Sequence, residues 1–345
     1  MLSERREESG ILYIYDSDLP NGALSNRYVT KIVAPNLIRM GNDCVYNCPK
    51  LDLFVAPKLK KIGRDNFEAC PLLKEIIAPY LKLQNIHFIG SLLIDLDKKE
   101  ILNIGLLDQK LVRAIEKELK SADELFLEVN GKNKVLKTLK HDILRVEDGV
   151  ITYLCLPTTK VVPAHALYGN KGIREFVALK AEKLDHNAIY KAQDLEVVRM
   201  PKLKEARFSN FSKCPRLKEV ISPILSTLQE GCFCSNPMLK SLPFEAFEYV
   251  ADGCFCDLKK IKDVKMTKLV ALGANSFEKN KLRLVYMPAL TYLERGTFLN
   301  STVEYLYAPK LTNRSPSIKY LKNARELMRN KHFLPERFID GLEKE

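Results

Sequence analysis

The feature that most constrains this chain is a hydrophobic anchor that returns every 22 residues. In the second half the anchors are Leu167, Ile189, Phe211, Phe233, Phe255, Phe277 and Phe298, with one final step of 21 residues. In the first half Val45, Phe67 and Ile89 keep the same step. A fixed period of this length is typical of a solenoid, in which each unit buries its apolar face against its neighbours. The repeat therefore predicts a long surface rather than a catalytic pocket.

Each unit opens with a segment rich in Val, Ile, Tyr and Phe that ends in proline. The clearest copies are Leu51–Pro57, Leu73–Pro79, Leu195–Pro201, Leu217–Pro223, Leu282–Pro288 and Val303–Pro309. These residue types favour a short strand, and proline ends it because proline lacks the backbone donor. A Lys-x-Leu segment then turns the chain. The Asn-Phe or Cys-Phe segment that follows predicts a short helical turn that inserts its aromatic ring into the core.

Several segments agree in register with one known repeat pattern. They are Leu59–Gly63, Phe67–Pro71, Leu73–Ile76, Phe211–Leu217 and Leu269–Gly273. On these segments the chain resembles the BspA-like class of leucine-rich repeat proteins over residues 28–89 and 150–310. The resemblance implies an α/β repeat solenoid, rich in β-structure, that curves as a leucine-rich-repeat superhelix with a parallel β-sheet on its concave face. It also implies adhesion or host-protein binding, since BspA-like proteins occur at bacterial surfaces and in microbes that colonise hosts.

The repeat divides the chain into five predicted segments. They are an N-terminal cap (1–27), leucine-rich repeats (28–89), an irregular insertion or degenerate repeats (90–150), further repeats (151–310) and a helical C-terminal cap (311–345). The cap is predicted from apolar residues at helical spacing after residue 317, because an uncovered last repeat would expose core. An alternative interpretation places a hinge in 90–150, between two separate arrays.

The irregular middle contains four local signals. Residues 91–104 predict a hairpin, and apolar residues at helical spacing predict an amphipathic helix from Leu106 to Leu119. A second, weaker helix is predicted from Lys132 to Leu144. Asp148 and Gly149 lie between β-formers and predict a tight hairpin turn.

The composition is that of a globular protein with excess positive charge. Among 345 residues 46% are hydrophobic and 28% are charged, and the formal net charge is +12. No apolar run approaches the ~18 residues of a membrane span. The charged N-terminus does not resemble a Sec-type signal peptide. Basic residues cluster at 199–218, where only Glu205 and the adjacent Glu219 oppose them, and at 259–268; both runs are interpreted as solvated repeat surface. Binding of acidic polymers, either nucleic acid or anionic lipid, is the alternative, and nucleic acid is not favoured because no binding motif accompanies the runs.

The cysteines follow the same period. Cys48 and Cys70, Cys232 and Cys254, and Cys234 and Cys256 are each 22 residues apart, so stacked units place each pair on neighbouring coils. We favour a packed ladder of buried thiols in a reducing compartment over zinc or disulfides, because Cys-x-Cys in an extended segment sends its side chains to opposite sides. No metal and no cofactor are expected.

Catalytic motifs do not emerge from the sequence. The five histidines show no metal-ligand spacing, and neither a nucleophile elbow nor a phosphate-binding glycine loop occurs. We expect no catalytic residues and no enzyme activity. The alternative is an enzyme with an unrecognised site in the 90–150 insertion.

The strand residues that face solvent are the best candidates for a binding site. In the copy at Leu73–Pro79 the leucine-rich-repeat register turns Ile76 and Ala78 to the core, and Glu75 and Ile77 outward. The equivalent columns become aromatic toward the C-terminal end, and tyrosine is a frequent anchor in interfaces. The predicted partner-binding residues are Tyr286, Tyr305, Tyr307, Arg199, Ile77 and Val55.

These observations predict a non-catalytic protein–protein interaction module. Its partner is expected to be a protein, with a host protein as one option, and the chain is expected to be monomeric. The expected location is the cytoplasm, or export without a Sec signal peptide. A scaffold and a secreted effector both fit this description.

Overall fold

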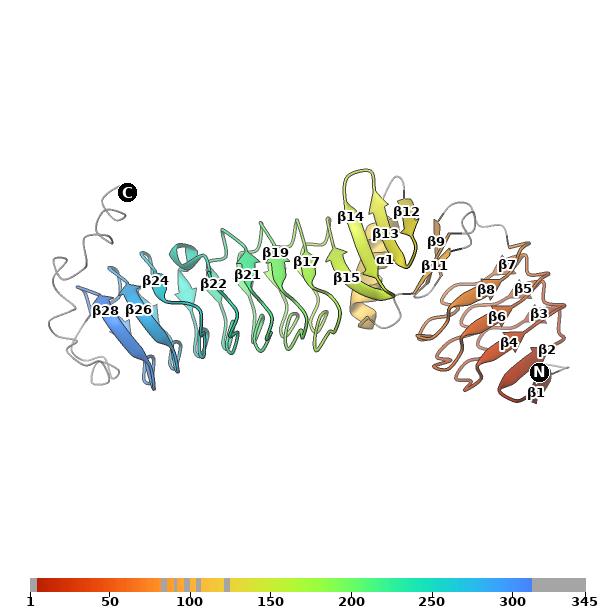
Figure 1. The fold of residues 1–345 in the computed structure, drawn as a ribbon, viewed down its shortest axis with the longest axis horizontal. Helices are drawn as coiled ribbons and strands as arrows, with labels where there is room; N and C mark the ends of the chain where they lie inside the picture. Colours follow the sequence, from red (N-terminus) through yellow and green to blue (C-terminus); the bar gives the residue numbers. More distant parts are fainter. Residues whose placement is uncertain are drawn as a thin grey trace. The chain divides into compact units, whose positions relative to one another are not determined.

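The computed structural model describes residues 5–81, 86–89, 92–95, 100–103, 107–120 and 125–311. The chain divides into two compact units, Met1–Gly149 and Val150–Glu345. In both units the chain winds in coils whose strands form parallel ladders (Figure 1). Within the described residues no helix is long and apolar enough to cross a membrane. The predicted helical cap at 311–345 lies, apart from Leu311, outside the described residues.

Two ladders of strands run through the first unit. One, the long-strand ladder, consists of β1 (Arg5–Glu8), β2 (Ile11–Ile14), β4 (Lys31–Val33), β6 (Leu53–Val55) and β8 (Glu75–Ile77). The other, the short-strand ladder, consists of β3 (Asp18–Leu19), β5 (Arg39–Met40) and β7 (Lys61–Ile62). All pairs are parallel except the β1–β2 hairpin. The segment predicted as a cap thus contains a hairpin whose second strand already begins the first coil.

The irregular middle is built from antiparallel strands and one helix. Its elements are β9 (Ile86–Ile89), β10 (Leu92–Asp95), β11 (Glu100–Asn103), α1 (Gln109–Lys120), β12 (Leu125–Asn130), β13 (Asn133–Thr138) and β14 (Asp142–Glu147). The predicted hairpin at 91–104 is confirmed by the β10–β11 pairing. The predicted helix is confirmed as α1, whose residues Leu111, Ile115 and Leu119 are buried. Asp148 and Gly149 have the positive φ angles, 48° and 79°, that a tight hairpin turn requires.

Two local predictions in this region are wrong. The segment Lys132–Leu144 is not helical but forms β13 and the start of β14. Leu136 lies opposite Leu127 on one side and Leu144 on the other, and all three are buried. Cross-strand packing of these leucines outweighs the weak helical spacing. Ile89 is not a repeat anchor either, because β9 pairs antiparallel with β10.

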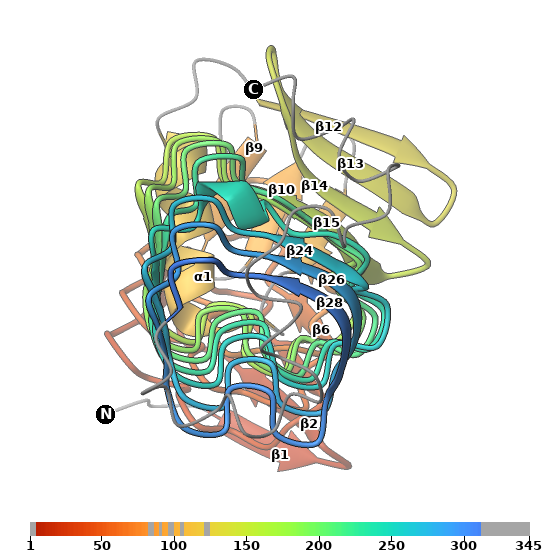
Figure 2. The same ribbon diagram turned by 90° about the vertical axis from the view of Figure 1, so that its left-hand side faces the viewer.

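The second unit repeats the two ladders over more coils. Its long-strand ladder contains β15 (Val150–Cys155), β17 (Glu175–Val177), β19 (Val197–Arg199) and β21 (Glu219–Ile221), and then β24 (Asp263–Lys265), β26 (Lys281–Tyr286) and β28 (Thr302–Tyr307). Its short-strand ladder contains β16 (Val161–Val162), β18 (Lys183–Leu184), β20 (Glu205–Ala206), β22 (Thr227–Leu228), β23 (Tyr249–Val250), β25 (Ala271–Leu272) and β27 (Tyr292–Leu293). The 3-10 helix η1 (Phe244–Ala246) interrupts the long-strand ladder between β21 and β24. Figure 2 shows these coils, green to blue, as nested loops.

The anchor residues form the centre of the second unit. Leu167, Ile189 and the five phenylalanines that follow are all at most 1% exposed. The rings stack from coil to coil, with 4.7 Å between the centroids of Phe211 and Phe233 and 5.8 Å between those of Phe277 and Phe298. The predicted helical turn at the anchors is wrong. Phe211 and Phe233 have φ angles of 63° and 62°, so left-handed residues close the turn instead. The fold is therefore a β-solenoid, in which α1 is the only α-helix among the described residues.

Buried asparagines join neighbouring coils. The amide nitrogen of Asn210, a fully buried residue, donates to the carbonyl oxygens of Asp185 at 2.7 Å and Arg207 at 2.8 Å. Its amide oxygen accepts the backbone N–H of Ile189 at 3.1 Å. Asn66, Asn236 and Asn280 make equivalent bonds in other coils. Each amide thus satisfies backbone groups that the tight turn would otherwise leave unpaired in the core.

Replacement of Asn210 by leucine tests this role. The variant Asn210→Leu leaves the N–H of Ile189 and two carbonyl oxygens buried without partners, so we expect a loss of about 3 kcal/mol in the free energy of unfolding. Urea denaturation followed by circular dichroism measures it. The matched control is Asn36→Leu, since Asn36 accepts one hydrogen bond from the Lys58 ammonium at the surface. Equal denaturation midpoints for the two variants would contradict the role assigned to Asn210.

Candidate interaction surfaces

The long-strand ladder of the first unit presents an apolar column to solvent. In the three-residue strands of this ladder the central residue faces the core, as Phe54 does at 0% exposure, and the flanking residues face out. This confirms the predicted register, in which Glu75 and Ile77 lie outside and Ile76 packs against the core. Backbone pairing stacks Tyr13, Val33, Val55 and Ile77 in one column. The two predicted binding residues of this unit, Val55 and Ile77, are therefore neighbours, and Ile77 is 40% exposed.

In the second unit the middle of the long-strand ladder is charged. Arg199 lies between Val177 and Ile221 in its column. Its Nε donates to Oε1 of Glu175 at 2.8 Å, and both side chains are part-exposed. Arg199, predicted as a binding residue, is thus already engaged in an ion pair on the surface.

The C-terminal strands of this ladder carry an aromatic cluster outside the solenoid core. Tyr286 and Tyr307 are paired in register and their rings stack at 5.0 Å with an interplanar angle of 9°. Leu284 lies opposite Tyr305 and completes the cluster. The three predicted tyrosines are therefore brought together. Tyr286 is only 9% exposed, so the accessible surface of the cluster belongs to the half-buried Tyr305 and Tyr307.

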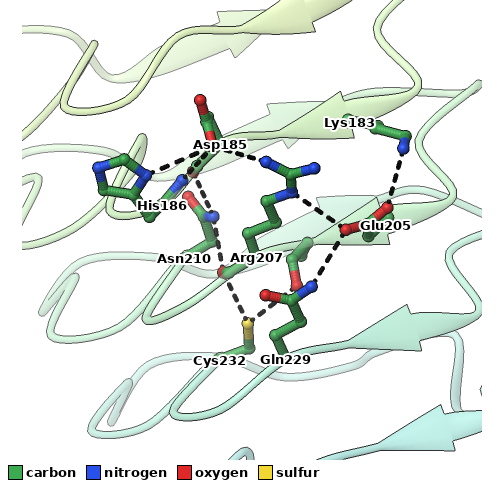
Figure 3. Close-up of polar contacts among 9 residues, drawn as sticks. Lys183, Asp185, His186, Glu205, Arg207, Asn210, Gln229 and Cys232 are labelled. Carbon is green, nitrogen blue, oxygen red and sulfur yellow. Dashed lines mark hydrogen bonds and ion pairs between the residues drawn. The ribbon is translucent and has the colours of Figure 1, made fainter.

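The short-strand ladder carries a network of ion pairs that the sequence did not reveal (Figure 3). Glu205 is its centre and receives Lys183 at 3.2 Å, the Nε of Arg207 at 3.2 Å and the amide of Gln229 at 3.2 Å. Arg207 also reaches Oδ1 of Asp185 at 3.2 Å. The groups come from neighbouring coils, so the network ties three coils together along the surface.

The network controls the ionisation of its two acids. Burial acts to raise the pKa of Asp185, but the backbone N–H of His186 and the guanidinium of Arg207 hold that pKa below its usual range. Burial likewise acts to raise the pKa of Glu205, and Arg207 and Lys183 bring it below its usual range. Both carboxylates therefore stabilise the folded state in their charged form.

Most of the first basic run is neutralised from the preceding coil. Arg199, Lys204, Arg207, Arg216 and Lys218 pair with Glu175, Glu182, Asp185, Asp194 and Glu196 respectively. Glu205 and Glu219 are the acids of the local stretch, but the carboxylates that pair with this run lie about one repeat earlier. Reading the sequence along its period would have found these partners. The run is thus a surface of alternating charge rather than a bare cationic patch.

The cysteines form two different structures. Cys44, Cys48, Cys70, Cys155, Cys214, Cys232 and Cys254 are buried free thiols. Several donate to carbonyl oxygens of the coil before, for example Cys232 to Arg207 at 3.3 Å and Cys254 to Gln229 at 3.2 Å. The predicted thiol ladder therefore describes these residues. Within the described part of the chain, no cluster of His, Cys, Asp and Glu could hold a metal ion.

The prediction of free thiols is wrong for one cysteine pair. Cys234 and Cys256 form a disulfide, with 4.6 Å between their Cα atoms. Both are part-exposed, whereas Cys232 and Cys254 two residues earlier are buried. The Cys-x-Cys spacing does send alternate side chains to opposite sides, and the outer pair is the one that is bonded.

The irregular middle contains a hollow of about 540 Å³ lined by β12, the end of β13 and residues 139–142. Glu128, Asp142 and His141 line it. Glu128 forms an ion pair with Lys137, and Asp142 pairs with Arg145 at 2.8 Å. The first pair joins β12 to β13 and the second lies within β14, so both acids have structural partners.

The comparisons with known proteins agree with the repeat geometry. A family model described as BspA type leucine rich repeat region matches six copies, over residues 17–91 and 182–304. The chain belongs to this family. No curated protein matches the chain.

Several solved structures of bacterial proteins are similar to this chain. They include the pneumococcal vaccine antigen PcpA (13% identity, covering 94% of this chain and 96% of that one, TM-score 0.33). A leucine rich cell surface protein of Faecalibacterium prausnitzii has 12% identity, coverages of 87% and 86%, and a TM-score of 0.30. A leucine-rich repeat protein of Bacteroides ovatus has 16% identity, coverages of 88% and 98%, and a TM-score of 0.37.

The ion-pair network predicts a loss of stability in acid. The pKa values of Asp185 and Glu205 are lowered by folding from 3.8 and 4.5, so their stabilisation is complete above those values and is lost as the pH falls through the lower folded values. We expect the variant Asp185→Asn/Glu205→Gln to lose about 1 kcal/mol near neutral pH and to show a flatter acid dependence. Urea midpoints measured across the acid range test this. The control is Glu219→Gln, an exposed carboxylate, and a matching acid profile in both variants would refute the assignment.

The buried thiols predict selective protection. Burial raises the pKa of the Cys214 thiol to about 12, so the reactive thiolate is scarce at mildly alkaline pH. We expect iodoacetamide to leave Cys214 unmodified in the native protein and to label it after unfolding in urea. Peptide mass spectrometry reads both results. Equal labelling rates in the native and unfolded states would show that the thiol is not buried as described.

Proposed function

We propose that this chain is a non-catalytic protein-binding module and that its partner binds the solvent-facing columns of the long-strand ladder. The observation that carries the proposal is the cluster of Leu284, Tyr286, Tyr305 and Tyr307, which lies outside the solenoid core. Folding of the coils does not require aromatic residues at these outward positions, as the charged pair Glu175–Arg199 on the same ladder demonstrates. Tyrosine combines apolar area with a polar tip and is enriched in interfaces.

Two further features support a protein partner over an acidic polymer. The family to which the chain belongs is built from repeats whose extended surfaces suit protein recognition. In addition, the basic run at 199–218 is largely paired with carboxylates of the preceding coil. A phosphate backbone or anionic lipid would have to displace these pairs.

The disulfide supports the exported alternative among the two predicted locations. Disulfides persist in oxidising environments and are rare in reducing ones. Cys234 and Cys256 are part-exposed, so a reducing cytoplasm would have access to their bond. The proposed role is therefore that of an exported protein that binds another protein, with a cytoplasmic scaffold as the alternative.

Substitution of the accessible tyrosines tests the proposed surface. Immobilised wild type and the variant Tyr305→Ala/Tyr307→Ala are compared for proteins retained from host-cell and own-cell lysates. We expect the variant to retain at least about tenfold less partner protein than wild type, because the anchor area is removed. Retention should also change little with salt, since the cluster is uncharged.

The control removes an exposed tyrosine at another place on the surface. Tyr80→Ala in the first unit removes a tyrosine that is 63% exposed and lies outside both tyrosine-bearing strands. Retention by this control with loss in the double variant supports the proposal. Equal retention by all three proteins, or retention that collapses with salt, would refute it, and the second result would favour an acidic polymer.

A further inference from the structure

A second surface, on the short-strand ladder of the second unit, contains a groove of about 830 Å³. Its floor is made by small residues on adjacent coils, namely Ala251, Ala271 and Gly273. Gly273 is fixed by packing, because a Cβ atom there would lie 2.5 Å from the backbone of Ala251. A glycine is therefore needed at this position for the two coils to pack as closely as they do.

Large apolar side chains stand beside this floor with most of their surface in solvent. Tyr249 is 58% exposed, Val270 is 54% exposed and Phe208 is 51% exposed. All three line the groove. They contrast with the inward residues of the same strands, such as Val250 and Leu272, which are buried in the core.

The charged residues that line the groove are all acidic. Glu230, Glu248, Asp252 and Glu294 line it, and no lysine, arginine or histidine does so. This is a local excess of negative charge on a chain whose net charge is +12. Glu230 and Asp252 occupy equivalent places on neighbouring coils. The backbone N–H of Gly231 donates to the carbonyl oxygen of Asp252 at 2.8 Å and joins these two coils.

Part of this charge is already engaged, and part is not. Glu248 meets Lys268 at 3.4 Å, but both side chains are about 60% exposed and the pair is weak in water. Asp252 accepts the backbone N–H of Ala274 at 2.8 Å through Oδ1. Among the described residues no ion pair joins Glu230, which is exposed. The groove thus combines exposed rings with carboxylates that have room for a cation.

We propose that this groove binds an extended segment of another protein that carries lysine or arginine. The long stems of such residues would lie on Tyr249 and Phe208, and their charged heads would meet Glu230, Asp252 and Glu248. From Phe208 to Glu294 the groove crosses five successive coils, about 19 Å at ~4.8 Å per step, which matches about six residues of extended chain. The surface is distinct from the tyrosine cluster of the long-strand ladder.

Peptide binding by the full chain tests this proposal. The probe is a short fluorescein-labelled peptide that alternates lysine and alanine, read by fluorescence anisotropy. The comparison peptides alternate glutamate and alanine, or acetyl-lysine and alanine. We expect the lysine peptide to bind at least about tenfold more tightly than either, because both comparisons lack the positive charge.

Variants assign the binding to the groove. Glu230→Gln/Asp252→Asn keeps an acceptor for the N–H of Ala274, and Tyr249→Ala removes the exposed ring. We expect each variant to bind the lysine peptide roughly tenfold more weakly than wild type does. Tyr28→Ala, in the first unit and 73% exposed, is the control and should bind as wild type does.

Circular dichroism and the urea midpoint confirm that each variant is folded, and the single variant Glu230→Gln provides a further test because its side chain is exposed. Equal binding of the three peptides to wild type, or unchanged binding in all groove variants, would overturn the proposal. Competition by neutral oligosaccharides with no effect of the charge variants would assign the groove to sugars and would also overturn it.

Discussion

The backbone register between neighbouring coils determines the neighbours of almost every side chain in this protein. Residues close to 22 positions apart lie opposite each other on adjacent parallel strands, as Val33 and Val55 do in the first unit and Val177 and Arg199 in the second. A residue therefore contacts its own equivalent in the next coil. Phenylalanines stack on phenylalanines, and buried asparagines form hydrogen bonds to the neighbouring coil. The same register that builds the core also aligns the outward columns from which the surfaces are made.

Much of this could be predicted because the period is visible in the sequence. The anchors, the prolines that end strands and the inward position of Ile76 follow directly from aligning copies. The ion pairs of Arg207 and Lys218 follow from the same alignment when charges are compared one repeat apart, but a local reading of the basic run misses them. The cysteine columns were also visible. The sequence could not show which column is bonded, because the spacing of Cys232–Cys254 and Cys234–Cys256 is identical.

Where the repeat is absent, local patterns were less informative. Lys132–Leu144 has weak helical spacing, yet Leu136 is buried between the strands on either side. The groove on the short-strand ladder was also missed, because attention to the longer strands leaves two-residue strands such as β23 and β25 without assigned faces. Small residues at Ala251, Ala271 and Gly273 are among those that line it, and they come together only when the coils are stacked.

The disulfide has a mechanical consequence that its place in the coil determines. Cys234 and Cys256 are 22 residues apart, so their bond closes a loop of one coil. A solenoid held by nearest-neighbour contacts yields to a pulling force coil by coil. When unravelling reaches this loop, the covalent bond withholds about 75 Å of contour length, at ~3.4 Å per residue, from the extending chain. The bond would then carry load between two coils that only noncovalent contacts otherwise join, which makes it a fixed point along the repeat.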